Sequence, residues 1–181
     1  MIDVQEQRPA GTAVKVRTPV KVKKIGHVVY RVSDVERTVR FWIDIMGFKE
    51  SDRNEHGMVF LRNAADHHTI ALAQAEPGAK LGDPNDRGAL GLNHFAMEVG
   101  SMDELFKIRE FLKANGVPIT YEGRRGPGSN PGVEFLDPDG YQLELYADME
   151  QIGWEGKSRP APFWRRATSL EEVVANPVPT E

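Results

Sequence analysis

Apolar residues recur along the first half of this chain with two periods, one typical of strands and one typical of helices. Residues 25–32 are rich in β-branched side chains and predict a strand, and residues 35–46 then carry apolar side chains at helical spacing. Ser33 or Asp34 can cap this helix, and Gly47 can end it. Three more strands are expected, at residues 48–52, 58–62 and 69–74. This half of the chain therefore predicts the order β-α-β-β-β.

The second half repeats that order. A strand is expected at residues 92–99, and a helix starts at Ser101, with Glu104 three residues later at the spacing of a capping box. Asn115 and Gly116 stop the helix. Three strands follow, at residues 117–121, 133–136 and 141–146, with a glycine-rich loop over residues 123–132. Because one unit occurs twice in the same order, the sequence predicts an α+β fold of two tandem βαβββ modules.

Composition divides the chain further. Proline, glycine and charged residues mark an extended arm and a linker, while the end of the chain is rich in Pro, Trp and Arg. The predicted parts are an N-terminal arm (1–24), a first module (25–75), a linker (76–90), a second module (91–148) and a C-terminal tail (149–181). Each module has only about fifty residues, too few for much core. We therefore expect the modules to close on each other, with the tail packed over the second.

Charge and cysteine content narrow the classes of function. The net charge of -4 and the pI near 5.8 give no electrostatic basis for binding nucleic acid or an anionic membrane. The absence of cysteine excludes disulfides, zinc-thiolate sites and thiol nucleophiles. The first residues lack the pattern of a signal peptide, and no apolar run approaches the ~20 residues that cross a bilayer. We therefore expect a cytoplasmic protein that acts on a small molecule.

Two histidines occupy equivalent places in the repeat. The stretch Gly26-His27-Val28-Val29-Tyr30 returns 67 residues later as Asn93-His94-Phe95-Ala96-Met97. The last expected strand carries one acidic residue, Glu144. Two imidazoles and one carboxylate on three strands can bind a divalent metal and leave positions open, as in non-haem iron(II) enzymes that activate oxygen. His27, His94 and Glu144 are therefore the predicted metal ligands, provided that the two first strands lie side by side.

With these residues the chain resembles the vicinal oxygen chelate superfamily, which includes glyoxalase I, fosfomycin and bleomycin resistance proteins, and type I extradiol ring-cleaving dioxygenases. The resemblance covers residues 25–148. It implies paired βαβββ modules that form a cup-shaped mixed sheet around a divalent metal, with ligand positions on the first and last strands. The counterpart of Glu144 in the first module is Ala71, so a glyoxalase-like fourth ligand is missing and the three-ligand extradiol pattern remains. The implied metal is Fe(II), with Mn(II) or another divalent ion as the alternative.

A second segment is similar to extradiol dioxygenases in particular. His67-His68-Thr69-Ile70-Ala71-Leu72 matches their His-x-x-Ala-Leu segment, whose histidine stands beside the metal as an acid and base. The resemblance gives this catalytic role to His68. Strict alternation would place His67, not His68, on the face of Ala71. The role of His68 therefore requires an irregular start to the strand.

Two positions depart from the extradiol pattern. The family has Arg-His where this chain has Arg124-Arg125, and a tyrosine ten residues before the glutamate ligand, where this chain has Glu134. Arg125 can bind a substrate anion or phenolate, but it cannot shuttle a proton near neutral pH. The predicted substrate-binding residues are Arg125, Glu134 and Tyr146. The candidates to replace the missing tyrosine are Tyr30, Tyr121 and Tyr146.

The resemblance implies an extradiol-type dioxygenase, expected to be a homodimer, that cleaves a catecholic ring with O2. One alternative is a metal-dependent isomerase or lyase of the glyoxalase kind, which stabilises an enediolate and uses no oxygen. The other is a binding or resistance protein that sequesters a planar small molecule without catalysis. Metal identity and oxygen uptake distinguish the three.

Overall fold

The computed structural model describes residues 20, 22–83, 88, 90–154 and 156–179, so most of the predicted N-terminal arm lies outside the described residues. The first module contains β1 (Val28–Val32), α1 (Val35–Arg40), the π-helical turn η1 (Phe41–Ile45), β2 (Lys49–Arg53), β3 (Val59–Arg62) and β4 (Ile70–Gln74). The second contains β5 (Phe95–Glu98), α2 (Met102–Ala114), β6 (Ile119–Arg124), β7 (Pro131–Leu136) and β8 (Gln142–Tyr146). The tail adds a 3-10 turn, η2 (Ala161–Phe163), and α3 (Leu170–Ala175).

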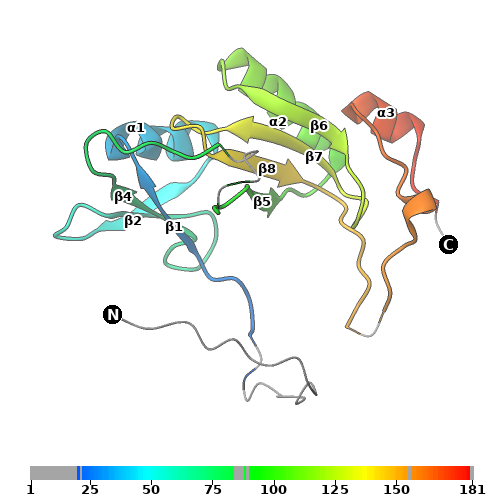
Figure 1. Ribbon diagram of the computed structural model, residues 1–181, viewed down its shortest axis with the longest axis horizontal. Helices are drawn as coiled ribbons and strands as arrows, with labels where there is room; N and C mark the ends of the chain where they lie inside the picture. The colour runs from blue at the N-terminus through cyan, green and yellow to red at the C-terminus, as the bar shows by residue number, and fades with distance from the viewer. Residues whose placement is uncertain (1–19, 21, 84–87, 89, 155, 180–181) are drawn as a thin grey trace.

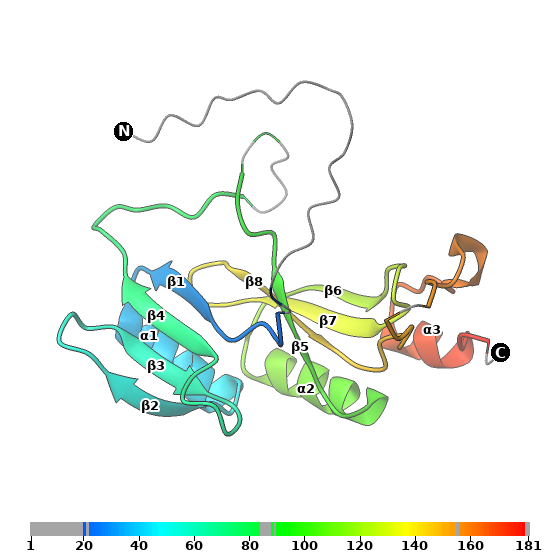
Figure 2. The same ribbon diagram turned by 90° about the horizontal axis from the view of Figure 1, so that it is seen from below.

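The strands form two four-stranded mixed sheets, in the orders β1-β4-β3-β2 and β5-β8-β7-β6. In each sheet the first strand of the module pairs in parallel with the last, and the other neighbours are antiparallel. The predicted α+β fold of two βαβββ modules is confirmed, although the eight strands form two sheets and not one. Helices α1 and α2 lie on the same side of the two sheets (Figures 1 and 2). The opposite face of each sheet, called here the outer face, is therefore not covered by these helices.

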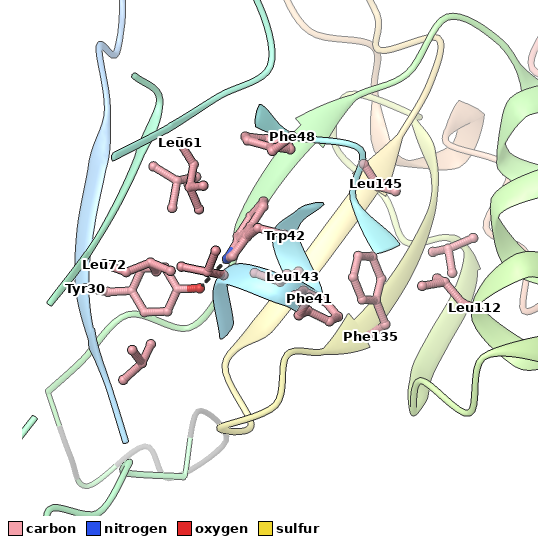
Figure 3. Packing of buried hydrophobic residues seen from close by; sticks show 14 of the residues in the cluster. Tyr30, Phe41, Trp42, Phe48, Leu61, Leu72, Leu112, Phe135, Leu143 and Leu145 are labelled. Carbon is pink, nitrogen blue, oxygen red and sulfur yellow. Dashed lines mark hydrogen bonds between the residues drawn. The ribbon is translucent and has the colours of Figure 1, made fainter. Parts of the chain in front are cut away.

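One hydrophobic core runs through both modules (Figure 3). Trp42 is fully buried, and its ring stacks on Phe95 of the second module with centroids 6.1 Å apart and an interplanar angle of 9°. Tyr30 also contacts Phe95, at 5.8 Å. Apolar side chains of both sheets complete the core, among them Leu61, Leu72, Phe135, Leu143 and Leu145. The modules thus close on each other through aromatic packing.

Polar contacts from the turn before β8 also join the two modules. Asp137 accepts a hydrogen bond from the Tyr30 hydroxyl at 3.2 Å, and this hydroxyl in turn accepts one from Trp42 Nε1 at 2.7 Å. Asp139 accepts from the Ser33 backbone and side chain and pairs with Arg37 at 2.6 Å. Because these partners lie about a hundred residues apart in sequence, the turn fixes the second module against β1 and α1.

The helix starts follow the predicted capping residues. The Asp34 side chain accepts from Arg37 N at 2.9 Å, and the Ser101 side chain accepts from Glu104 N at 3.3 Å. The first helix changes to a π-helical turn at Phe41, which the apolar spacing did not indicate. Among the described residues, no helix is long and apolar enough to cross a membrane.

The tail packs on the second module, beside β6 (Figure 2). Arg124 and Ala167 exchange two backbone hydrogen bonds, of 2.9 and 3.0 Å. A Cβ added to Gly123 would lie 2.2 Å from Ala167 O, so this close approach requires glycine. Strand β6 runs to Arg124 and β7 begins at Pro131, which makes the glycine-rich loop shorter than predicted because the tail extends the pairing.

Candidate metal centre

Alternation along the strands sorts the candidate residues onto the outer face. In β8, Leu143 and Leu145 are buried in the core, so Glu144 between them points to the opposite face. His94 directly precedes Phe95, which packs against the core. His27 stands at the equivalent place before β1 and is exposed. The sequence therefore directs all three predicted ligands away from the core.

The pairing register supports the assignment of Ala71 as the counterpart of Glu144. Val28 of β1 pairs with Ile70, and the equivalent residue of β5, Phe95, pairs with Leu143. The next residues along the two last strands are Ala71 and Glu144. Since alanine has no ligating atom in its side chain, this position of the first module cannot supply a metal ligand.

The structure brings together His94 and Glu144. The distance from His94 Nε2 to Glu144 Oε2 is 3.2 Å, and the side chains are 35% and 15% exposed. The other ring nitrogen, Nδ1, lies 2.7 Å from Asn93 Oδ1. A partner of this kind fixes the ring so that Nε2 faces the carboxylate, the usual arrangement around a metal-binding histidine. These two donors fit two positions of a divalent metal.

Two residues that sequence reasoning missed shape the carboxylate site. Asn130 Nδ2 donates to Glu144 Oε1 at 3.3 Å. A Cβ added to Gly132 would lie 2.6 Å from the same oxygen, so only glycine leaves room for the carboxylate in this position. Burial raises the pKa of Glu144, and Glu134 raises it further, while His94 and Arg125 oppose the shift. The glycines of this loop were visible in the sequence, but the approach of β7 to Glu144 was not.

Arg125 and Glu134, both predicted to bind substrate, form an ion pair next to this site. Arg125 Nε and Nη2 lie 2.6 and 2.8 Å from the two oxygens of Glu134, which also accepts from Gln142 Nε2. Glu134 is opposite Glu144 in the register of β7 and β8. Its side chain is only 5% exposed, whereas that of Arg125 is 61% exposed and lies over the ring of Tyr121 at 3.7 Å. Arg125 thus neutralises a buried acid and presents its guanidinium to solvent.

His27 and His68 lie together in the first module. Their ring centroids are 4.6 Å apart, and His68 also contacts the Phe60 ring at 5.0 Å and His67 through nitrogens 3.1 Å apart. Burial lowers the pKa of His68, and nearby His27 and His67 lower it further. His68 lies two residues before β4, which begins at Ile70, so the alternation of that strand does not fix the direction of its side chain.

The predicted ligands thus occupy two half-sites, with His94 and Glu144 in one and His27 beside His68 in the other. Within the ranges that the structure describes, no group of three His, Asp or Glu side chains is close enough to hold a metal ion. Two of the three predicted donors are therefore assembled. The complete triad stays a prediction.

The three candidate tyrosines differ in position. Tyr30 is buried in the core and bonded to Trp42 and Asp137, and burial raises its pKa strongly. The Tyr121 hydroxyl donates to Ala167 O at 2.8 Å, which ties it to the tail. Tyr146 lies two residues after Glu144 on the same face of β8. Of the three, Tyr146 has the position that suits substrate contact.

A family model described as the Glyoxalase/Bleomycin resistance protein/Dioxygenase superfamily matches residues 24–145, which cover the first module and nearly all of the second. The chain belongs to this superfamily. A similar fold is found in FosX, a fosfomycin resistance protein from Listeria monocytogenes, which aligns with a TM-score of 0.54 and 23% identity, over 70% of this chain and 94% of that one. At this identity the likeness establishes the fold alone.

Curated relatives in the superfamily have different reactions. The chain is 29% identical over 134 residues to a manganese-dependent 2,3-dihydroxybiphenyl 1,2-dioxygenase from Geobacillus genomosp. 3, an alignment of 72% of this chain and 38% of the relative. It is 32% identical over 130 residues to a probable chloroplastic lactoylglutathione lyase from Arabidopsis thaliana, over 68% and 35% of the two chains. The chain thus spans little more than a third of the length of these relatives.

Proposed function

We propose that this protein is a divalent metal-dependent dioxygenase of the extradiol type, which cleaves a catecholic aromatic ring with O2. The observation that carries the proposal is the His94–Glu144 pair, at 3.2 Å on the outer face, combined with alanine at the equivalent acidic position of the first module. This combination favours the three-ligand extradiol pattern over a four-ligand glyoxalase site. Fe(II) is the proposed metal, with Mn(II) as the alternative.

In the proposed site His94 and Glu144 supply two ligands and His27 supplies the third. When bound, the metal would supply Lewis-acid activation of the substrate hydroxyls and a route for electrons to oxygen. His27 lies beside His68 in the structure, so its approach to the other two donors is part of the proposal. Asn93 and Asn130 hold the ligand side chains in place.

His68 is the proposed proton-transfer residue. Its lowered pKa keeps the imidazole neutral near pH 7, so it can accept a proton from a catechol hydroxyl and return that proton as a general acid later in the reaction. The rings of His27 and Phe60 restrict its orientation. Each of these contacts belongs to the first module, whereas the assembled ligand pair belongs to the second.

Arg125, Glu134 and Tyr146 are proposed to form the substrate side of the site. The exposed guanidinium of Arg125 can bind an anionic oxygen of the substrate, while the bidentate pair with Glu134 holds it in position. A cavity of about 320 Å³ is lined by Arg125 and Glu134, together with Thr120 and Gln142. The cavity is large enough for a single aromatic ring, in the range typical of small-molecule sites.

A metal-dependent isomerase or lyase is the second candidate, because a 32% identical relative is a lactoylglutathione lyase. Such an enzyme would use the same ligand pair without oxygen. The missing acid at Ala71 disfavours this candidate. The expected homodimer and the cytoplasmic location belong to the proposal as well, and analytical ultracentrifugation and cell fractionation test them.

The decisive experiment begins with anaerobic purification of the full chain and reconstitution with Fe(II), Mn(II), Ni(II) or Zn(II). Oxygen uptake is then measured with catechol, 3-methylcatechol and 2,3-dihydroxybiphenyl. We expect uptake with Fe(II) or Mn(II), accompanied by a coloured ring-opened product. Turnover of a methylglyoxal–glutathione adduct with Ni(II) or Zn(II), without oxygen uptake on any catechol, would establish the second candidate instead.

A further inference from the structure

A cavity of about 710 Å³ lies between the tail and the second module, apart from the candidate metal centre. Its lining residues come mainly from the loop that joins β6 to β7, the segment after β8, and the end of α3. Its polar lining includes Arg124, Ser129 and Arg159, together with the acids Asp148 and Glu150. Apolar side chains also line it, among them Ile152, Val173 and Pro177. A cavity with both kinds of lining suits a ligand that has a polar head and an apolar body.

Arg124 is a buried cation at this cavity. It is 4% exposed, and its Nη atoms donate to the backbone carbonyls of Arg165, Asn176 and Val173. Its Nε has no hydrogen-bond partner, and within the described ranges no carboxylate forms an ion pair with it. Burial and the nearby Arg159 lower the pKa of Arg124. A buried charge without a counter-charge costs free energy that an anion can offset.

Ser129 and Arg159 also have buried polar atoms without a hydrogen-bond partner. Ser129 Oγ is buried without a partner, and Arg159 pairs through Nε with Glu150 at 3.2 Å while its Nη1 has none. In the part of the chain that the structure describes, four buried side-chain atoms lack a partner, and three of them belong to residues that line this one cavity. Buried polar groups are nearly always satisfied, so this concentration points to a missing partner.

We propose that this cavity binds a small organic carboxylate, with the oxyanion head at Arg124, Ser129 and Arg159 and the apolar body against Ile152, Val173 and Pro177. Guanidinium groups bind carboxylates through charge-assisted hydrogen bonds, and Arg124 Nε and Arg159 Nη1 are donors without a partner. Among the other charged residues of the lining, Lys157 adds positive charge, while Asp148 and Glu150 are acidic and Glu150 is paired with Arg159.

The carboxylate site is separate from the candidate metal centre. Arg124 and Arg125 are consecutive, yet Arg125 binds Glu134 beside Glu144 whereas Arg124 binds carbonyls of the tail. Because Arg124 also holds the end of α3, an occupied cavity would stabilise the packing of the tail on β6. The ligand would therefore act on the tail without occupying the site proposed for catechol.

The test uses the full, metal-free chain and octanoate as the probe, followed by isothermal titration calorimetry and by the thermal unfolding midpoint. We expect saturable binding of one octanoate per chain and a higher unfolding midpoint. Arg159→Gln should weaken binding by about tenfold or more, as expected when a charge-assisted hydrogen bond is lost. Arg166→Gln is the matched control, because this tail arginine lies over Trp164 and does not line the cavity.

Ser129→Ala provides a second variant that does not disturb the tail, since Arg124→Gln would also remove the bonds to the carbonyls of the tail. Weaker octanoate binding by Ser129→Ala, with an unchanged unfolding midpoint in the absence of ligand, supports the site. The proposal is overturned if millimolar octanoate does not bind, since water then satisfies the buried donors. It is also overturned if 1-octanol or inorganic phosphate binds as tightly as octanoate.

Discussion

The two modules share one order of elements but place different chemistry on the outer face. The second module has a carboxylate and an imidazole in contact, Glu144 with His94, supported by Asn130. The first has Ala71 at the position of the acid and instead gathers His27 and His68. The two modules therefore share the histidine before the first strand, His27 and His94, but not the acid of the last strand. In the proposed function, metal affinity would come mainly from the second module and proton transfer from the first.

The largest expected effect is the loss of metal from His94→Ala and Glu144→Ala. Each removes one of the two assembled donors, so we expect metal affinity to fall by more than about 100-fold, beyond the 10–100-fold typical of outer-shell partners. His27→Ala should have a smaller effect, because in the proposed site His27 lies beside His68 and would join the pair only when metal binds. Chelator competition measures the affinities, with His56→Ala as a control at an exposed turn. Full metal occupancy in all three variants would refute the site.

His68→Gln tests the part assigned to the first module. The variant should retain metal and catechol binding, since His68 is not a proposed ligand, while turnover falls by about 10²–10⁴-fold, as for the loss of a general acid. Stopped-flow absorbance separates substrate binding from ring opening. His56→Gln is the control, because His56 is exposed in the turn between β2 and β3. Wild-type turnover by His68→Gln would remove the proton-transfer role.

Gly132→Ala should produce an intermediate effect on the second module. The added methyl group would lie 2.6 Å from Glu144 Oε1 and must displace the carboxylate. We expect metal affinity to fall about tenfold, within the range for residues that orient a ligand. Gly91→Ala is the control, since an added Cβ there meets nothing within 4 Å. Equal affinities of the two variants would mean that the position of Glu144 in the structure is not the metal-binding one.

The smallest effect concerns the junction between the modules. Burial raises the pKa of Asp137, although the backbone of Tyr141 and Asp139 and the Tyr30 hydroxyl donate to it. A carboxyl whose pKa is higher in the folded than in the unfolded protein binds its proton more tightly in the folded state. Its contribution to folding stability is therefore present below its ordinary pKa and is lost as pH rises toward the pKa of the folded state. Relative to Asp137→Asn, the wild type should therefore lose stability as pH rises above about 4. Urea unfolding midpoints from acid to neutral pH measure this difference; parallel curves would contradict it.

Local signals in the sequence predicted most of the fold. Asp34 and Ser101 cap helices as expected, and alternation around Glu144 indicated the face on which it lies. These features depend on residues that lie close together in the sequence, so a hydrophobic period or a short motif can reveal them. The repeat also predicted that His27 and His94 are equivalent, because residues at the same place in two copies of one module lie on the same face of their sheets.

Contacts between distant segments could not be predicted in the same way. The pairing of Arg125 with Glu134, the distance from Gly132 to Glu144 and the bonds from Arg124 to the tail join strands or segments whose approach no local pattern specifies. The contact of His27 with His68 has the same origin, since β1 and β4 meet only after the sheet forms. The sequence could therefore name candidate ligand positions, but it could not predict which of them meet, and the structure brings together only His94 and Glu144.

The stacking of Trp42 on Phe95 has a consequence for how the chain folds. Trp42, the largest fully buried side chain of the first module, completes its burial against the second module. Neither module alone is therefore expected to fold stably. The two halves should then appear in a single kinetic phase. A protease cut in the linker should leave two fragments that stay bound to each other. Fragments produced separately should associate and fold when they are mixed.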